Sequence, residues 1–456
     1  MTAVARAGLT SRLRTWVTPA RSLLVGYGSL MALGGLLLSL PASSEDRTPQ
    51  AILDALFTAT SALTTTGLVV VDTGAYYSLF GEIVILALMQ VGGLGYMAFI
   101  AFLALLMGRR LSLRAGATLE QSLAGFTTDG VRGFAVLVFV YTALFEIVGT
   151  IVLAAFWMET HGLTRALYLG LFHSVSTFCT AGFALFPDSF MSDADNVTIN
   201  LTIAFLSLAG ATGFFALHDL WVHGVKSLRR ERPRRLAVHT RLIMAVAFPV
   251  AIGGTALLLL TEPASSLGPG LGHRLATSTF QVLSAATTTG FNSIDIGAMS
   301  STGLFTIIII MFIGASPGGT GGGIKTTTLA TVMLAVSRLL RGEQDTQVFW
   351  RRIPDATVRR ALAIGLLATM VIALVTLGLT VTEDAPFLGI LFEVVSALST
   401  VGLSTGITPS LTDGGKVLLC LTMLVGRVGP LAIGFALLAD PVKGKLRYAE
   451  EDVFIG

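Results

Sequence analysis

Long apolar segments alternate with short polar ones along this chain. Residues 23–40, 79–107 and 362–381 are clear apolar segments of roughly the 20-residue length that a membrane-spanning helix needs. Between two other apolar runs lies SAATTTGFNSID, residues 284–295, which is small and polar. Polar, non-helical backbone at this place predicts one of two structures: an external loop, or backbone held inside a membrane.

The polar stretch belongs to a motif that occurs four times, Phe-x3-Ser-x3-Thr-x-Gly-[Leu/Phe]. The copies are FTATSALTTTGL (57–68), FHSVSTFCTAGF (172–183), FQVLSAATTTGF (280–291) and FEVVSALSTVGL (392–403). Their glycines are Gly67, Gly182, Gly290 and Gly402. The near-constant spacing of these glycines indicates four tandem structural repeats.

Each motif follows a helix-like segment that is too short to cross a membrane. We therefore expect each repeat to consist of a span, a short re-entrant helix, an extended polar loop and a second span. Backbone without regular structure is tolerated at membrane depth only where it is buried in protein or lines a water-filled cavity. Four loops that converge on one axis meet that condition, so the pattern predicts a pore lining. Ordinary external turns, or small residues for helix packing, are the alternative.

The residue types suit a dehydrated cation. Rings of carbonyl oxygens can replace its water, and glycine permits the backbone conformations that turn carbonyls inward. Threonine adds hydroxyl oxygens, and the carboxyl end of each short helix favours positive charge. The candidate ion-binding residues of this filter are Thr65, Thr66, Gly67, Leu68, Thr180, Ala181, Gly182, Phe183, Thr288, Thr289, Gly290, Phe291, Thr400, Val401, Gly402 and Leu403.

Composition supports a membrane protein that crosses the bilayer many times. Of the 456 residues, 53% are hydrophobic and 12% are charged, and the mean hydropathy is +0.79. Soluble domains carry about 25% charged residues. The two cysteines lie in apolar surroundings, so we expect no disulfide framework.

The sequence pI of about 9.0 raises the question of a nucleic-acid partner, but the placement of the basic residues argues against one. Five stretches hold 25 of the 30 Lys and Arg residues: 6–21, 109–132, 226–241, 325–360 and 443–447. This alternation is the positive-inside pattern. It predicts eight full spans with both termini and three loops in the cytoplasm. We expect membrane lipids around the chain and no cleavable signal peptide.

The fold class we expect is an all-α integral membrane protein with four repeats in pseudo-fourfold arrangement around one pore. The expected segments are a cytoplasmic N-terminal segment (1–21), repeat one (22–110), repeat two (111–230), repeat three (231–345), repeat four (346–440) and a cytoplasmic tail (441–456).

A glycine-rich run, GASPGGTGGG (314–323), interrupts the second span of repeat three. Each glycine costs a helix roughly 1 kcal/mol and proline ~3 kcal/mol relative to alanine, so a regular helix is excluded. We expect a flexible loop across the ion path below the filter, with a packing kink as the alternative. A phosphate-binding P-loop needs Gly-Lys-[Ser/Thr], whereas Ile324 here separates Gly323 from Lys325.

Arg427 is the one basic residue inside a predicted span. Such a charge usually faces a cavity or a partner, so Arg427 is expected to repel cations or to hold the glycine-rich loop. A structural ion pair is the alternative. We expect Lys325 to extend toward the membrane surface. The candidate gate residues are Gly314, Gly318, Gly319, Gly321, Gly322, Gly323, Lys325 and Arg427.

Several other polar residues have weaker signals. Asp72 and Asp295 each lie five residues after a filter glycine and are candidates for attracting cations, although solvated loop carboxylates are commoner. Glu146 is a buried acid without an evident partner. His173 and Glu393 occupy matching positions of the motif, and we expect both to be structural.

The chain resembles the superfamily of K+ transporters that contains the Trk, Ktr and plant HKT proteins. The resemblance runs from about residue 21 to 456 and rests on the four motifs, each with one glycine. It also rests on LAVHTRL (236–242), GGTGGGIKTTT (318–328), MLVGRVGPL (423–431) and RYAEEDVFIG (447–456). The last two are most similar to the Ktr branch.

This resemblance implies K+ uptake through a pore within each subunit of a homodimer in a bacterial plasma membrane. It implies a gate in the glycine-rich loop and a cytoplasmic nucleotide-binding regulatory ring of the KtrA type, which fits loops too short to fold as a regulatory domain. The transported ion would be K+, with Na+ as a candidate coupling ion and no organic cofactor. Gly67 favours K+, because plant relatives that prefer Na+ carry serine there. The absence of a TVGYG run leaves weaker selectivity open.

Three rival functions remain. A Na+-permeable or less selective monovalent cation transporter would keep the fold. A transporter of organic solutes with broken helices would be expected to show inverted repeats and a charged substrate site. An enzyme would need metal-ligand spacing or a nucleophile with a base, and neither occurs, so we expect no catalytic residues.

Overall fold

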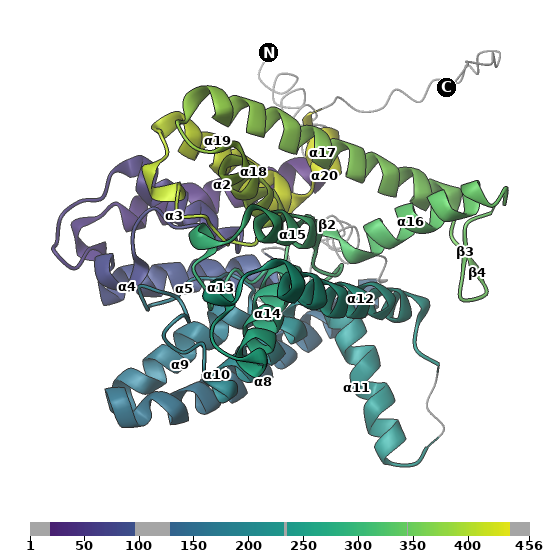
Figure 1. The fold of residues 1–456 in the computed structure, drawn as a ribbon, viewed down its shortest axis with the longest axis horizontal. Coiled ribbons are helices and arrows are strands. Elements are labelled where there is room, and N and C mark those ends of the chain that lie inside the picture. Colours follow the sequence, from purple (N-terminus) through teal and green to yellow (C-terminus); the bar gives the residue numbers. More distant parts are fainter. Residues whose placement is uncertain (1–18, 96–127, 232–234, 344, 438–456) are drawn as a thin grey trace, which may run out of the picture.

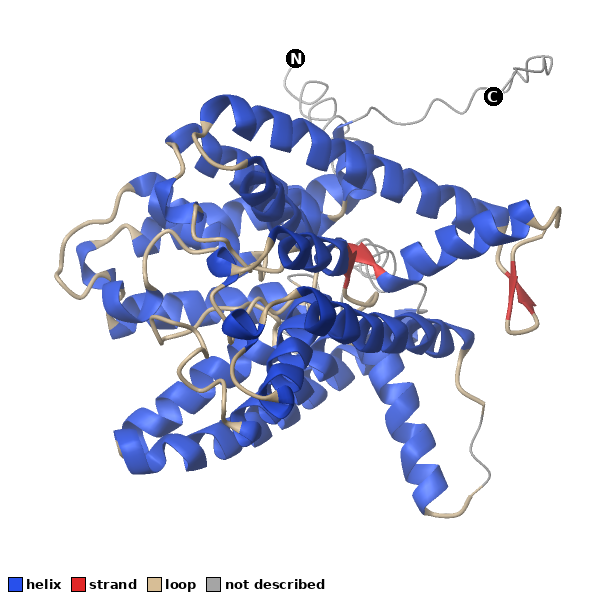
Figure 2. Cartoon of the chain, in the orientation of Figure 1, coloured by secondary structure: helices blue, strands red, loops and turns tan. Residues whose placement is uncertain are grey.

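The computed structural model describes residues 19–95, 128–231, 235–343 and 345–437, which form a bundle of helices (Figure 1). The described strands form two short two-stranded sheets, so helices dominate throughout (Figure 2). This confirms the all-α class. The expected N-terminal cytoplasmic segment up to residue 18, the tail 441–456 with its RYAEEDVFIG ending, and most of the basic stretch 109–132 lie outside the described residues.

The first span of each repeat is one long apolar helix. These helices are α2 (Pro19–Leu38), α8 (Thr128–His161), α12 (Val238–Thr261) and α17 (Asp355–Thr382). Within the described residues they are the four single helices that are long and apolar enough to cross a membrane. Their exposed apolar side chains, such as Leu366 and Ile151, suit a lipid environment.

The second span is divided into two helices wherever the structure describes it fully. The first parts are α5 (Leu79–Leu94), α10 (Val197–Ala211), α15 (Ser301–Phe312) and α19 (Asp413–Val428), and the second parts are α11 (Phe214–Leu228), α16 (Thr326–Leu340) and α20 (Pro430–Leu437). The sequence predicted such a break only in repeat three. The helices α10 and α11 meet at an angle of 111°. Taken together as one bent span, they add a fifth candidate to the four single helices.

Glycines with positive φ mark these breaks. Gly95, Gly213 and Gly429 have φ of +77°, +89° and +95°, which no helix accommodates. At Gly213 the reason is a close approach: an added methyl group would meet the Pro317 carbonyl oxygen of the glycine-rich loop at 2.5 Å. The second span of repeat two is therefore bent where the glycine-rich loop needs space beside it, whereas Gly95 and Gly429 have no neighbour within 4 Å.

Between the two spans of each repeat lies a re-entrant helix of 12 to 16 residues, too short to cross a membrane alone. These helices are α3 (Ile52–Leu63), α9 (Leu163–Phe178), α14 (Leu271–Ala286) and α18 (Phe387–Ser399). The second-span helix of each repeat packs on the re-entrant helix of the next: α5 on α9, α10 on α14, α15 on α18, and α19 on α3. This order closes the four repeats into a ring.

Short elements complete the fold. They are η1 (Pro41–Ser43), α4 (Thr73–Tyr76), α13 (Ala264–Leu267), η2 (Ile296–Ala298), η3 (Thr408–Ser410), the parallel strands β1 (Ile313–Gly314) and β2 (Ile324–Lys325), and the antiparallel strands β3 (Gln347–Val348) and β4 (Arg351–Arg352). The pair β1–β2 brackets the glycine-rich loop, so that the chain leaves the span and returns to nearly the same place.

Helical glycines let the second spans approach the ends of the re-entrant helices. Gly92, Gly210 and Gly426 each lie against the carbonyl of a residue near the end of such a helix, and an added methyl group would overlap that oxygen. The carbonyls belong to Leu63, Phe178 and Leu398. In repeats one, two and four the second span is thus in close contact with the end of the re-entrant helix.

We expect Gly210→Ala to destabilise the protein, because the added methyl group forces α10 away from α9. Overpacking of this kind costs about 1–3 kcal/mol, or a fall of roughly 3 °C or more in the thermal unfolding midpoint. The matched control is Gly253→Ala in α12, where an added methyl group meets nothing within 4 Å. Thermal unfolding in detergent, followed by size-exclusion chromatography, compares the two. An equal midpoint for both variants would contradict the close packing at Gly210.

Candidate functional site

The serine of each motif ties the following loop to its re-entrant helix. The backbone carbonyl of each serine accepts the N–H of the residue before the motif glycine at 2.7–2.9 Å. The four pairs are Thr66 with Ser61, Ala181 with Ser176, Thr289 with Ser284, and Val401 with Ser396. The hydroxyls of Ser61 and Ser396 also accept the N–H of the glycine at 3.0 Å. These bonds hold the N–H side of the loops toward protein.

Each loop has a left-handed threonine and a left-handed glycine, separated by one residue. The threonines Thr65, Thr180, Thr288 and Thr400 have φ between +50° and +58°, and the glycines Gly67, Gly182, Gly290 and Gly402 have φ between +71° and +93°. Positive φ is rare for a β-branched residue and costs of order 1–3 kcal/mol at each site. The same strain at the same motif position in four repeats indicates that the surrounding structure imposes it.

The four glycines face one another around a closed ring. A methyl group on Gly67 would meet the Ala181 carbonyl oxygen at 2.6 Å, and one on Gly182 would meet the Thr289 carbonyl oxygen at 2.5 Å. On Gly290 and Gly402 it would overlap the carbonyl oxygens of Val401 and Thr66. Each loop therefore touches the next, and the fourth touches the first. The predicted loops come together at one place in the structure.

The carbonyl groups of this ring have no hydrogen-bond donor within the described part of the chain. No described residue donates a hydrogen bond to the carbonyls of 65–67, 180–182, 288–290 or 400–402. More than 90% of buried backbone polar groups are paired, so a cluster of unpaired carbonyls requires another partner. Carbonyl oxygens in rings are the ligands that replace the water of a monovalent cation. Within the described residues there is also no cluster of His, Cys, Asp and Glu that suits a metal ion.

The glycine-rich loop lies directly against the four left-handed threonines. The hydroxyl of Thr320 is 3.3 Å from that of Thr180, and the Thr65 hydroxyl donates to the Thr320 carbonyl at 3.4 Å. Added methyl groups on Gly321 and Gly322 would overlap the hydroxyls of the other two threonines, Thr288 and Thr400. The loop therefore covers one side of the ring.

Hydrogen bonds hold this loop in place. The loop binds the backbone at the break in the second span of repeat two. There the Thr320 N–H donates to the Gly210 carbonyl at 3.1 Å, and the Ser316 N–H donates to the Ala211 carbonyl at 3.0 Å. The Nζ of Lys325 donates to the Gly321 carbonyl at 2.6 Å. The expectation that Lys325 extends toward the membrane surface is therefore wrong, since its ammonium group bends back to satisfy loop carbonyls.

Arg427 joins the loop, the ring and the first repeat. Its guanidinium donates to the Thr65 hydroxyl at 2.8 Å, to the Thr320 carbonyl, and to the Gly92 carbonyl at the end of α5. A planar guanidinium with several donors suits such a bridge. The contacts with the loop agree with the predicted holding role. Among the described ion pairs there is none with Arg427, so the alternative of a structural ion pair is not observed.

The outer carboxylates act as helix caps in the structure. Asp72 accepts the Ala75 N–H at the start of α4, and Asp295 accepts the Gly297 N–H at the start of η2. Glu146, for which the sequence offered no partner, accepts a hydrogen bond from the Gln90 amide at 3.2 Å. These bonds give each of the three acids a structural role.

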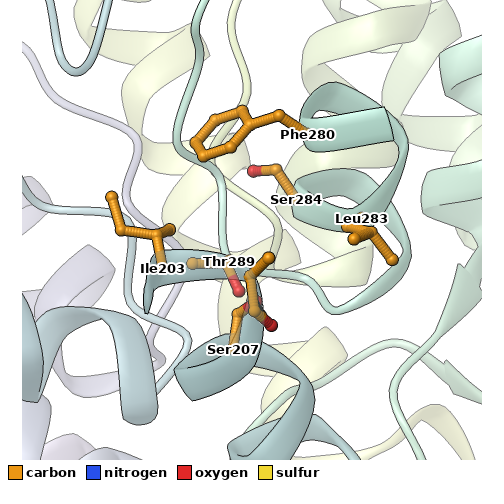
Figure 3. A pocket seen from close by; sticks show the side chains of 7 residues that line it. Ile203, Ser207, Phe280, Leu283, Ser284 and Thr289 are labelled. Atoms are coloured by element: carbon orange, nitrogen blue, oxygen red, sulfur yellow. Dashed lines mark hydrogen bonds between the residues drawn. The ribbon is translucent and has the colours of Figure 1, made fainter. Parts of the chain in front are cut away.

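A crevice between α10 and α14 reaches the back of the third loop (Figure 3). It is lined by Ile203, Ala204, Ser207, Phe280, Leu283, Ser284 and Thr289. Most of this lining is apolar, and the Ser284 hydroxyl already donates to the Phe291 carbonyl at 2.6 Å. The crevice therefore offers a cation far fewer oxygen ligands than the ring does.

Sequence reasoning found the filter glycines and the glycine-rich loop but missed two features. One is the anchoring role of the motif serines, which were visible only as a constant position. The other is Thr320, which is not among the predicted gate residues, because those were chosen for their glycines and charges. Its hydroxyl donates to the Phe178 carbonyl at 2.9 Å and lies 3.3 Å from the Thr180 hydroxyl. The constancy of Ser and Thr in all four motifs was the available signal for the first.

Known proteins resemble this chain over nearly its whole length. Residues 35–440 match the TrkH family, described as cation transport proteins. The Ktr system potassium uptake protein B of Bacillus subtilis (strain 168) is 36% identical, over 97% of this chain and 98% of its own. The potassium/sodium uptake protein NtpJ of Enterococcus hirae is 31% identical, over 98% and 99%. The crystal structure of the potassium transporter TrkH from Vibrio parahaemolyticus has a similar fold, with a TM-score of 0.69 at 20% identity, over 91% of this chain and 84% of that one.

We expect Ser396→Ala to lower stability, because the Gly402 N–H would be left buried without its hydroxyl acceptor. An unsatisfied buried group costs about 1–3 kcal/mol. The control is Ser29→Ala, at an exposed serine whose hydroxyl bonds only to its own helix at Gly26. Thermal unfolding in detergent should give a clearly lower midpoint for Ser396→Ala than for Ser29→Ala. Equal midpoints would show that the hydroxyl does not support the loop.

Proposed function

Because the chain belongs to the TrkH family of cation transport proteins, we propose that it is the K+-translocating subunit of a Ktr-type potassium uptake system. It is a multi-pass membrane protein, and the proposed location is a bacterial plasma membrane with both termini in the cytoplasm. The observation that carries the proposal is the closed ring of four loops. Its carbonyls lack donors from the described protein, and they are the ligand type that a dehydrated K+ needs.

In this proposal the four stretches 65–68, 180–183, 288–291 and 400–403 form the selectivity filter. The carbonyls of Phe183 and Phe291 accept hydrogen bonds from the motif serines, so the ion ligands are the carbonyls of the residues before them. The carboxyl ends of the four re-entrant helices point at the filter and stabilise positive charge. The last residue of each stretch, Leu68, Phe183, Phe291 or Leu403, is buried, which supports a rigid wall behind the carbonyls. The proposed repeats retain the boundaries 22–110, 111–230, 231–345 and 346–440.

The second candidate function is a Na+-permeable or less selective monovalent cation transporter of the same fold. It is favoured by one observation, the name of the Enterococcus hirae relative, which is a potassium/sodium uptake protein. Coupling of K+ uptake to Na+ belongs to the same question. No organic cofactor and no catalytic residue form part of the proposal.

We further propose that the glycine-rich loop is the gate. It covers one side of the ring, where Thr320, Gly321 and Gly322 meet the filter threonines. A loop held by hydrogen bonds from Lys325 and Arg427 can leave when those bonds break, whereas a packed helix would need to move as a whole. The structure corresponds in this proposal to the closed gate.

A separate protein would supply regulation in this proposal, as a cytoplasmic nucleotide-binding ring of the KtrA type, and the chain would act as a homodimer. The hairpin β3–β4 offers a contact for such a partner. The side chain of Trp350 at its turn is 99% exposed, while the neighbouring Phe349 ring is covered by Arg241, whose guanidinium carbon lies 3.9 Å from the ring centroid. A fixed hairpin with an exposed tryptophan suits a protein interface.

Ion uptake into liposomes that contain the purified protein tests the filter. We expect wild type to take up K+ and Rb+ at least about tenfold faster than Na+, and Gly290→Ser to lose this preference, because a side chain at Gly290 overlaps the Val401 carbonyl. The matched control is Gly253→Ser, at a glycine with no neighbour within 4 Å. Equal uptake of K+ and Na+ by wild type would favour the second candidate function.

The gate proposal has its own variant in the same liposomes. We expect Arg427→Gln to raise K+ uptake by about tenfold or more in the absence of the regulatory ring, because the loop loses its bonds to the guanidinium. The preference for K+ should remain. The control is Arg338→Gln, which removes an exposed ion pair with Glu343. Uptake that falls in Arg427→Gln, or that rises equally in the control, would contradict a closing role for Arg427.

A further inference from the structure

The motif residue after phenylalanine differs in each repeat but occupies one place in the structure. In repeats two, three and four it accepts the N–H of the third residue after the filter glycine. The backbone N–H groups donate to side-chain atoms: Leu185 to His173 Nε2 at 3.1 Å, Ser293 to Gln281 Oε1 at 3.4 Å, and Thr405 to Glu393 Oε1 at 2.9 Å. In repeat one the residue is Thr58, and no such bond is described there. The side chain thus fastens the segment that leaves the filter.

Only one of these side chains is an acid that can carry a negative charge. Glu393 is completely buried, and its carboxylate accepts hydrogen bonds from Ser404, Thr405 and Thr408. The Ser404 hydroxyl donates at 2.6 Å and the Thr408 hydroxyl at 2.8 Å. All of these groups are available donors, so they match an ionised carboxylate, which is an acceptor only. Hydrogen bonds to the charged form favour that form.

The matching residues in the other repeats are neutral. His173 has an Nδ1 that contacts the Leu169 carbonyl and an Nε2 that accepts the Leu185 N–H. With one nitrogen donating and the other accepting, the ring is uncharged. Gln281 is an amide. Among these positions only the fourth repeat therefore offers an acid, although the four loops share the same backbone conformation.

Glu393 has no cationic partner among the described residues. None of the described ion pairs includes it, and its neighbours are serine and threonine groups. A buried charge without a counter-charge is costly, and such charges are normally paired. Glu393 lies in α18, and the filter residues 400–402 lie along the chain between it and Thr405, whose N–H it accepts. The proposed cation site is therefore close in sequence to this carboxylate.

We propose that Glu393 supplies the counter-charge for the cation held in the filter, acting as a positioning residue through the loop that it fastens. This inference rests on the proposed function. It assigns to one residue two separable effects: its hydrogen bonds to Thr405 hold the filter segment, and its charge raises the affinity for the cation. Glutamine would retain the first effect and remove the second, as Gln281 shows in repeat three.

The experiment measures the KM for K+ uptake in liposomes for wild type, Glu393→Gln and Glu393→Asp. We expect the KM of Glu393→Gln to rise at least about fivefold, with maximal rate and K+ preference retained, because a negative charge near the site is lost. Glu393→Asp retains the charge and should restore much of the affinity. The matched control is Glu383→Gln, a half-buried carboxylate that also accepts bonds from a threonine, Thr412.

Each result bears on the inference. An unchanged KM in Glu393→Gln, or an equal rise in Glu383→Gln, would overturn the role of the charge while leaving K+ transport intact. Absence of K+ uptake by wild type would instead contradict the proposed function. If Glu393→Gln does not fold, Gln281→Glu tests the same claim in the opposite direction. The added charge should then lower the KM for K+ about fivefold, and an unchanged KM would overturn the inference.

Discussion

Backbone carbonyls inside a membrane must have partners, and the rest of this structure depends on that constraint. Long helices satisfy their own carbonyls, so the four first spans need nothing further. The loops after the re-entrant helices do not, because the N–H before each motif glycine is bound by the motif serine while the carbonyls of 65–67, 180–182, 288–290 and 400–402 have no described donor. Four such loops can exist at membrane depth only together, around a shared partner. In the proposed function a cation is that partner for all of them at once.

The same constraint explains where the chain has strain and where it has glycine. Left-handed threonines at four equivalent positions are unfavourable individually, yet all four repeats adopt them. Below the ring, the glycine-rich loop supplies small residues that fit against the threonine hydroxyls, and Arg427 and Lys325 bind its carbonyls. The filter, the loop and the bent second spans are therefore one connected network of hydrogen bonds, in which the break at Gly213 makes space for the loop.

Much of this architecture was predictable from the sequence. The four-part repeat, the all-α fold and the loop at residues 314–323 followed from motif spacing and from residue propensities, which are local properties. The bends at Gly213 and Gly429 were not predicted, because a lone glycine in an apolar run is also common in straight helices that pack closely. The predicted direction of the Lys325 side chain was wrong for a related reason. The direction of a long side chain depends on which carbonyl groups the tertiary structure leaves without a donor. The left-handed threonines depend on neighbouring repeats, which no local pattern reports.

The most direct test of the central claim is an anomalous diffraction measurement on crystals of the protein grown in Rb+. If the ring of carbonyls binds the transported ion, Rb+ density will lie on the axis between the four loops, in contact with the carbonyls of Thr66, Ala181, Thr289 and Val401. Density that is absent from the ring but present elsewhere, for example in the crevice between α10 and α14, would contradict the account.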